Sequence, residues 1–422
     1  MKKIVLISIV ILLVFLPVAL VLSCQQQPAP APSPPPPPPA PAPPPPEEAA
    51  QAEFQVDSVG IASVAVVEGE SVVVSVGVTN IGEADGAYTA VLKINGVEEA
   101  QKDVHISAGA SEMVTFELVG DTIGIYELDV GGQTASFRVI GEVFLGQSLA
   151  SLKDSNGLIV ACEPQSFESP YKGKVEAYRI RYLSDGLEVV GFVVKPKGND
   201  VTYPILIYNR GGNREFGKIE DPTLTYLSYL SANGYVVVAS QYRGNDGGQG
   251  REEFGGSDIN DVLNLIPLVE NLPFVTPEKI VMLGYSRGGM MTYIAISMTE
   301  KVKAAVVVGG VTDCIQGYYE RKKKMKQVYI ELIGGTPEQK EAEYQKRSAY
   351  FWPEKINTPV LILHGGDDWR VKVTQAEKLS EKLEELGKTY ELVVYHGGSH
   401  GLWENEQDRD DRILKWFAKY LD

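Results

Sequence analysis

Hydrophobic and polar residues alternate along this chain in two different patterns, which divide it into two folded regions. Between 53 and 140, short runs with a period of two, such as Ser71-Val72-Val73-Val74-Ser75-Val76-Gly77-Val78, are separated by turn-forming residues. This pattern predicts strands at 71–78, 88–94, 111–118, 125–130 and 134–139. Asn95-Gly96 is typical of a tight hairpin turn. Short strands at this spacing, with no helical stretch among them, predict an all-β sandwich.

The second pattern extends from about 171 to 422. In this range, strands alternate with amphipathic helices. The expected strands lie at 176–183, 187–195, 204–208, 235–240, 279–283, 303–308, 359–363 and 389–395. The expected helices lie at 222–233, 258–270, 290–298, 374–386 and the C-terminus, with a helical insertion after 308. Such alternation predicts a mostly parallel, doubly wound sheet covered on both faces. The order resembles the α/β-hydrolase fold. Residues 141–170 carry no clear pattern and are interpreted as a linker.

The first 24 residues indicate the compartment. Lys2 and Lys3 precede an apolar stretch from 4 to 22, and Ser23-Cys24 follows. A charged start, a hydrophobic core and a small residue at the end are typical of an export signal. The ending resembles a bacterial lipobox, which implies that Cys24 is lipidated. The alternative is an uncleaved membrane anchor, because the apolar stretch is almost long enough to span a bilayer. Both interpretations place the remainder outside the cytoplasm, at the cell membrane or envelope.

Residues 25–52 consist mainly of Pro, Ala and Gln, and include proline runs at 34–39 and 43–46. Such a segment cannot build a core and favours an extended polyproline II conformation. At about 3.1 Å per residue, its part from 25 to about 48 would reach about 70 Å. We interpret it as a disordered, semi-rigid stalk.

Composition limits the possible partners and chemistry. The net charge is −16, and no segment resembles a basic face that could bind phosphates. Both observations argue against nucleic acid as a partner. A lysine-rich run at 321–326 is interpreted as a solvated helix face. Besides Cys24, the chain has Cys162 and Cys314, which could form a disulfide or be small buried hydrophobes. No ligand cluster for a metal or an organic cofactor is found, and His105 is interpreted as structural.

The sequence also contains candidate catalytic residues in a meaningful order. Gly284-Tyr285-Ser286-Arg287-Gly288 joins a predicted strand to a predicted helix, and a serine at such a turn is held clear of the sheet. A serine hydroxyl needs a histidine to take its proton and a carboxylate to orient that histidine. Asp367 and Asp368 follow the strand at 359–363, whereas His396 and His400 follow the strand at 389–395. The order Ser, acid, His is that of α/β-hydrolases.

The loops around these residues resemble the prolyl oligopeptidase family. The stretch His364-Gly365-Gly366-Asp367-Asp368-Trp369-Arg370-Val371 resembles the family's acid loop, and Tyr242-Arg243-Gly244 resembles another of its loops. The resemblance covers about 172–422. It implies a serine peptidase that works through an acyl-enzyme, with Asp368 as the acid and His400 as the base. Asp367 is then a solvent or turn residue, His396 is structural, and His364 supports the loop.

The oxyanion that forms on the substrate needs backbone donors near Ser286. One is the N–H of Arg287, and the other is expected from Gly212 or Gly211 in the loop Asn209-Arg210-Gly211-Gly212-Asn213. The family commonly has His-Gly-Gly here, so Asn209-Arg210 is a departure that leaves the second donor open.

Two further points bear on the substrate. The run from Val76 to Gly96 resembles the cell-adhesion-related bacterial domain (CARDB), which implies an immunoglobulin-like sandwich at 53–140 and a spacing role or a cell-surface ligand. The propeller that precedes the catalytic domain in oligopeptidases has no room here, so peptide specificity stays open. The alternatives are a carboxylesterase or deacylase of the same fold, or a surface-binding protein with an inactive hydrolase domain.

Overall fold

The computed structural model describes residues 50–198 and 201–421. The signal peptide expected at 1–24, its Cys24 and most of the stalk expected at 25–52 lie outside the described residues. No helix in the described part of the chain is long and apolar enough to cross a membrane.

The N-terminal region is built of strands alone, in two sheets. One sheet contains β1 (Phe54–Ile61), β3 (Ser71–Asn80) and β6 (Ser111–Val119). The other runs in the order β2 (Ala65–Val67), β8 (Gln133–Ile140), β7 (Gly124–Val130), β4 (Gly86–Ile94) and β5 (Val97–Ile106). Alternate residues of β3, from Val72 to Val78, are buried in a core shared with the second sheet.

The five strands predicted in this region are present, and β1, β2 and β5 were missed. β5 has a physical reason: it lies at the edge of its sheet and most of its residues are exposed. An edge strand of this kind needs no apolar alternation, so its sequence carries little of the signal on which the prediction rests.

The second region contains a nine-stranded sheet in the order β17-β16-β15-β14-β12-β13-β11-β10-β9. The strands are β9 (Ile159–Pro164), β10 (Val175–Ser184), β11 (Leu187–Pro196), β12 (Tyr203–Asn209), β13 (Val236–Ser240), β14 (Val275–Tyr285), β15 (Val302–Val308), β16 (Val360–Gly365) and β17 (Tyr390–Tyr395). Strands β12 to β17 pair with one another in parallel. The pairs β9–β10, β10–β11 and β11–β13 are antiparallel. The sheet is therefore mostly parallel, as predicted. It begins inside the segment expected as a linker, because β9 pairs with β10.

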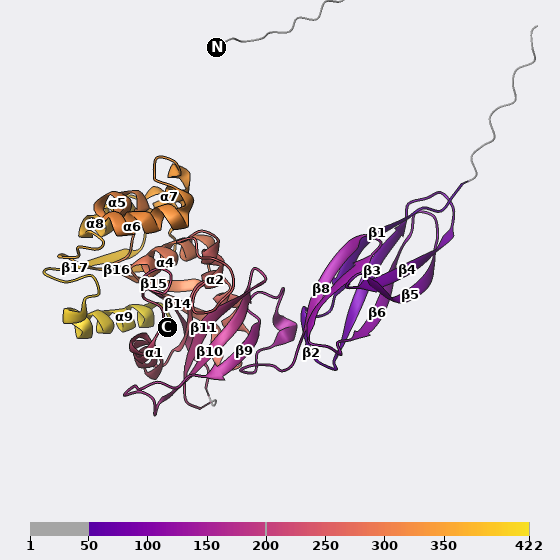
Figure 1. The fold of residues 1–422 in the computed structure, drawn as a ribbon, viewed down its shortest axis with the longest axis horizontal. Helices are drawn as coiled ribbons and strands as arrows, with labels where there is room; N and C mark the ends of the chain where they lie inside the picture. The colour runs from indigo at the N-terminus through magenta and orange to yellow at the C-terminus, as the bar shows by residue number, and fades with distance from the viewer. Residues whose placement is uncertain (1–49, 199–200, 422) are drawn as a thin grey trace, which may run out of the picture. The chain divides into compact units, whose positions relative to one another are not determined.

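Helices cover both faces of this sheet (Figure 1). α1 (Asp221–Ala232) and α9 (Glu406–Leu421) pack on the face that includes Leu206 of β12. α2 (Asn260–Leu263), α3 (Leu265–Glu270), α4 (Arg287–Met298) and α8 (Val373–Glu385) pack on the face that includes Ile205 and Ile207. The single helix expected at 258–270 is interrupted. α3 contains Pro267, which lacks the N–H that would continue a helix from α2.

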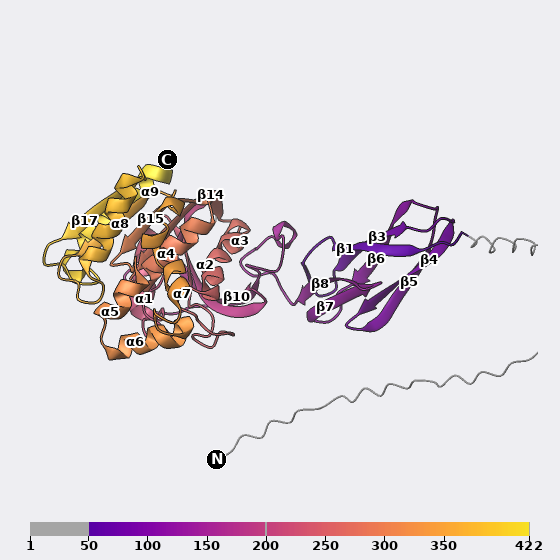
Figure 2. The same ribbon diagram turned by 90° about the horizontal axis from the view of Figure 1, so that it is seen from above.

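The insertion after β15 is helical, as expected. It comprises α5 (Cys314–Glu320), α6 (Lys323–Tyr329), a π-helical turn (Ile330–Gly334) and α7 (Glu341–Lys346), which lie together in Figure 2. Short 3-10 turns complete the described chain at Leu149–Ser151, Ser257–Ile259, Ala349–Phe351, Pro353–Lys355 and Trp403–Asn405. Cys162 and Cys314 are both free, so the two do not form a disulfide.

Candidate active site

The order of the strands defines where a site can form. The chain leaves β12 for β13 on one side and then returns to β14 on the other side of β12. In sheets of this kind, the crevice at such a reversal, beyond the carboxyl ends of the strands, is the usual ligand site. The Gly211-Gly212 loop follows β12, and Ser286 follows β14. Two of the predicted site segments therefore meet at this point.

Ser286 sits in a sharp turn between β14 and α4. Its backbone has φ 56° and ψ −119°, a conformation that costs a non-glycine residue about 1–3 kcal/mol. The Ser286 N–H donates to the Val308 carbonyl at the end of β15, at 2.9 Å. The neighbouring strand thus holds the turn that projects the serine from the sheet.

The glycines on either side of Ser286 are required by close packing. A Cβ on Gly284 would lie 2.3 Å from the Gly288 carbonyl oxygen. A Cβ on Gly288 would lie 1.8 Å from the Asn209 carbonyl oxygen. The Gly-x-Ser-x-Gly spacing therefore lets the strand, the helix and the loop after β12 approach one another around Ser286.

Asp368 and His400 are in contact. His400 Nδ1 lies 2.6 Å from Asp368 Oδ2, and Asp368 Oδ1 accepts the backbone N–H groups of Arg370 and Val371 at 2.7 and 3.0 Å. Burial raises the pKa of Asp368, but the hydrogen bonds from His364 and His400 outweigh it and hold the pKa well below its ordinary value. Asp368 is therefore an anion that can orient His400 and stabilise its protonated form.

The competing residues lie elsewhere. Asp367 is exposed, and its backbone N–H donates to the Gly398 carbonyl at 3.0 Å. His396 is exposed in the turn after β17. His364 is fully buried, and its Nε2 lies 2.9 Å from the Val371 carbonyl oxygen and 3.4 Å from Asp368 Oδ2. His364 thus braces the acid loop from inside.

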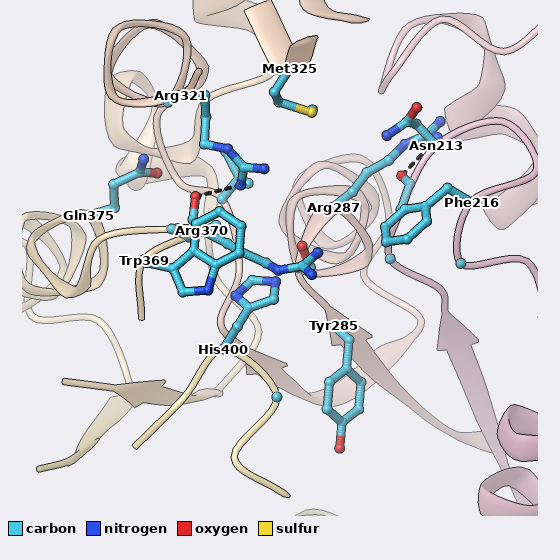
Figure 3. A pocket seen from close by; sticks show the side chains of 18 of the residues that line it. Asn213, Phe216, Tyr285, Arg287, Arg321, Met325, Trp369, Arg370, Gln375 and His400 are labelled. Atoms are coloured by element: carbon cyan, nitrogen blue, oxygen red, sulfur yellow. Dashed lines mark hydrogen bonds between the residues drawn. The ribbon is translucent and has the colours of Figure 1, made fainter. Parts of the chain in front are cut away.

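Ser286 and His400 line the same cavity, whose volume is about 460 Å³. Figure 3 shows His400 in this pocket, which Tyr285, the residue before the serine, also lines. Asp368 is not among the residues that line the cavity, because it lies behind the His400 ring. The structure therefore gathers all three predicted residues at one site.

A glycine outside the predicted site residues allows the contact between His400 and Asp368. Gly309, just after β15, has φ +55°. A Cβ there would lie 3.2 Å from His400 Nδ1 and 3.4 Å from Asp368 Oδ2. The signal was present in the sequence, since Gly309-Gly310 follows a buried strand at the same edge of the sheet.

The loop after β12 borders Ser286. A Cβ on Gly211 would lie 3.2 Å from the Ser286 Cβ, and Gly212 has φ +76°. Arg287 is the first residue of α4, so its N–H has no acceptor within the helix. The predicted oxyanion donors are thus close to Ser286. The choice between Gly211 and Gly212 stays a prediction.

The departure from His-Gly-Gly has a structural explanation. Arg210 is buried, and its guanidinium donates to the carbonyl oxygens of Gln241, at 2.7 Å, and Gly211, at 3.1 Å. It also lies over the Tyr242 ring, 5.0 Å from the ring centroid. Burial lowers the pKa of Arg210 to about 10. Arg210 therefore holds the glycine loop from behind.

The side chain of Arg287 has a structural role that its position in the motif did not reveal. Its side chain is buried and pairs with Glu252 at 2.7 Å and Asp258 at 2.5 Å. The side chain therefore fixes the start of α4, and the backbone N–H stays the predicted oxyanion donor. Within the described ranges, no group of three or more His, Cys, Asp and Glu side chains is arranged to hold a metal ion.

Comparisons with known proteins identify the family. Residues 223–422 match the model of the prolyl oligopeptidase family. An uncharacterized peptidase, YtmA of Bacillus subtilis, is 35% identical over 258 residues, which cover 61% of this chain and 98% of that protein. Acylamino-acid-releasing enzyme 1 of Oryza sativa is 26% identical over 223 residues, which cover 46% of this chain and only 27% of that protein.

Solved structures share the fold. An acylaminoacyl peptidase of Pyrococcus horikoshii superposes with a TM-score of 0.52 at 15% identity, over 83% of this chain and 74% of that one. A puromycin-hydrolyzing peptidase of Mycobacterium tuberculosis gives 0.51 at 17% identity, over 83% and 66%.

Proposed function

This chain belongs to the prolyl oligopeptidase family of serine peptidases, and from that premise we propose that it is an exported enzyme that cleaves peptide bonds through Ser286, Asp368 and His400. The observation that carries the proposal is the 2.6 Å contact between His400 Nδ1 and Asp368 Oδ2 beside the cavity that Ser286 lines.

In this mechanism His400 Nε2 takes the proton of the Ser286 hydroxyl as its oxygen attacks the peptide carbonyl. Asp368 fixes the imidazole with the proton on Nδ1 and stabilises the imidazolium that forms. The backbone N–H groups of Arg287 and Gly212, with Gly211 as the alternative, stabilise the oxyanion. His400 then protonates the leaving amine. Water attacks the acyl-enzyme with His400 again as the base, which releases the acid product and free Ser286.

A labelling and turnover experiment tests this proposal. We expect a fluorophosphonate to attach to the purified full-length protein at one site, the tryptic peptide that contains Ser286, as read by mass spectrometry. We also expect aminoacyl arylamides to be hydrolysed. Turnover of short-chain aryl esters with no hydrolysis of any arylamide would favour the carboxylesterase instead. Absence of both labelling and turnover would favour a surface-binding protein with an inactive hydrolase domain.

We further propose that Cys24 is lipidated and that 25–52 serves as a stalk from the cell membrane or envelope. Cys24→Ser is expected to abolish incorporation of labelled fatty acid and to move the protein from the membrane fraction to the soluble fraction. Cys162→Ser is the matched control, since Cys162 is free and lies on β9. A Cys24→Ser protein that remained lipidated would refute the assignment.

For 53–140 we propose an immunoglobulin-like, CARDB-type sandwich that spaces the enzyme or binds a cell-surface ligand. The pairing of its first strands supports this. β1 pairs antiparallel with β3 in one sheet, whereas β2 pairs parallel with β8 in the other. The chain therefore crosses between sheets at its start, which ties the two layers together.

A further inference from the structure

The active-site cavity is cationic, although the protein as a whole is acidic. The sequence has a net charge of −16. Among the described residues that line the cavity there is no Asp or Glu, and there are three arginines: Arg287, Arg321 and Arg370. Arg287 is neutralised by Glu252 and Asp258. The cavity's positive charge therefore comes from Arg321 and Arg370.

These two arginines differ from Arg243 and Arg409, whose charges are balanced by aspartates. Arg243 pairs with Asp261 at 2.7 Å, and Arg409 pairs with Asp410 at 2.8 Å. Within residues 50–198 and 201–421, no ion pair joins Arg321 or Arg370 to a carboxylate. Both are only partly exposed. The two charges thus face the cavity without a counter-ion from the chain.

The guanidinium groups are held in place by other contacts. Arg321 Nη1 donates to the Arg370 carbonyl at 2.8 Å, which links the end of α5 to the acid loop. Both groups lie against the Trp369 ring, 5.5 and 5.1 Å from its centroid, and Arg370 also lies 5.9 Å from that of Phe216. Figure 3 shows the Arg370 side chain extending past His400 into the pocket. The two cations are therefore held at the wall of the cavity that Ser286 and His400 also line.

Asp368 forms no ion pair with either arginine, because its side-chain contacts are with His364 and His400. Its oxygens also accept two backbone N–H groups, so His400, His364 and the loop backbone surround the carboxylate. Burial lowers the pKa of Arg321, although nearby Asp368 acts in the opposite direction. A partly buried guanidinium without an ionic partner gains most from an incoming carboxylate, which matches its planar pair of donors.

We propose that this cavity selects substrates that carry a carboxylate next to the scissile bond, which Arg321 and Arg370 bind. The carboxylate belongs either to an acidic side chain or to the free end of a short peptide. This inference rests on the proposed peptidase function and adds its substrate class.

The experiment uses the full-length protein and internally quenched peptides in matched pairs. One arm compares Glu with Gln at each position flanking the cleaved bond, and the other compares a free C-terminal acid with its amide. A charge-assisted hydrogen bond of about 1.5 kcal/mol corresponds to about tenfold in kcat/KM. We expect the acidic peptide of a pair to have an about tenfold higher kcat/KM in at least one arm. The arm that shows this preference identifies the source of the carboxylate.

Arg321→Gln and Arg370→Gln, singly and together, should bring the ratio of acidic to neutral kcat/KM close to one. Lys324→Gln removes the same charge from an exposed position on α6 and should leave the ratio unchanged. A ratio near one in the unmodified protein, or a preference for acidic peptides that survives the double substitution, would overturn the inference. In either case, cleavage of the neutral peptides would still support the proposed peptidase function. Failure to cleave any peptide would overturn both.

Discussion

Replacing Ser286 with alanine is expected to lower kcat by about 10⁶-fold and to abolish labelling by a fluorophosphonate. In the proposed mechanism, the hydroxyl is the only part of the residue that takes part in bond making. The left-handed backbone at Ser286, the N–H bond to Val308 and the packing of Gly284 and Gly288 would persist without it. The protein should therefore fold normally and bind substrate with a nearly unchanged dissociation constant.

The matched control is Ser297→Ala, near the other end of α4. Its hydroxyl donates to the Ile294 carbonyl of its own helix at 2.7 Å, and it does not line the cavity. We expect labelling and kcat close to those of the unmodified protein. Labelling that survived in Ser286→Ala, at the same rate and on the same peptide, would sink the assignment of the nucleophile.

Much of this site could be predicted because the chemistry follows the ends of buried strands. The apolar runs before Ser286, Asp368 and His400 mark β14, β16 and β17, whose carboxyl ends meet at one edge of the sheet. Once the strands are assigned, the loops that can meet are few. The choice of Asp368 over Asp367 depended on family resemblance, because alternation alone does not distinguish adjacent aspartates.

What the sequence could not reveal depends on contacts between distant segments. Gly309 is one such case, since its missing side chain matters only because His400 and Asp368 pack against it. Arg321 is another. It begins a lysine-rich run that reads as a solvated helix face, and Lys322 to Lys324 are indeed exposed. Arg321 itself is partly buried against Trp369 and lines the cavity. Arg321 thus faces inward because its guanidinium donates to the carbonyl of Arg370, which is 49 residues away in the sequence.

Asp368→Asn is expected to lower kcat by about 10⁴-fold with little change in KM. The backbone N–H groups of Arg370 and Val371 both point at Oδ1, so they require an oxygen there. The introduced amide must then place its NH₂ group where Oδ2 contacted His400 Nδ1. That NH₂ can only donate, which moves the imidazole proton from Nδ1 to Nε2. In this tautomer His400 cannot accept the proton of Ser286.

Asp367→Asn provides the control within the same loop. Asp367 is exposed, and its backbone N–H donates to the Gly398 carbonyl, a contact that the substitution keeps. We expect kcat within about twofold of the unmodified enzyme and a free energy of unfolding within about 0.5 kcal/mol. Steady-state kinetics with one arylamide, beside thermal unfolding of all three proteins, make the comparison. If Asp367→Asn lost activity and Asp368→Asn kept it, the acid would be Asp367, and the 2.6 Å contact with His400 would be structural only.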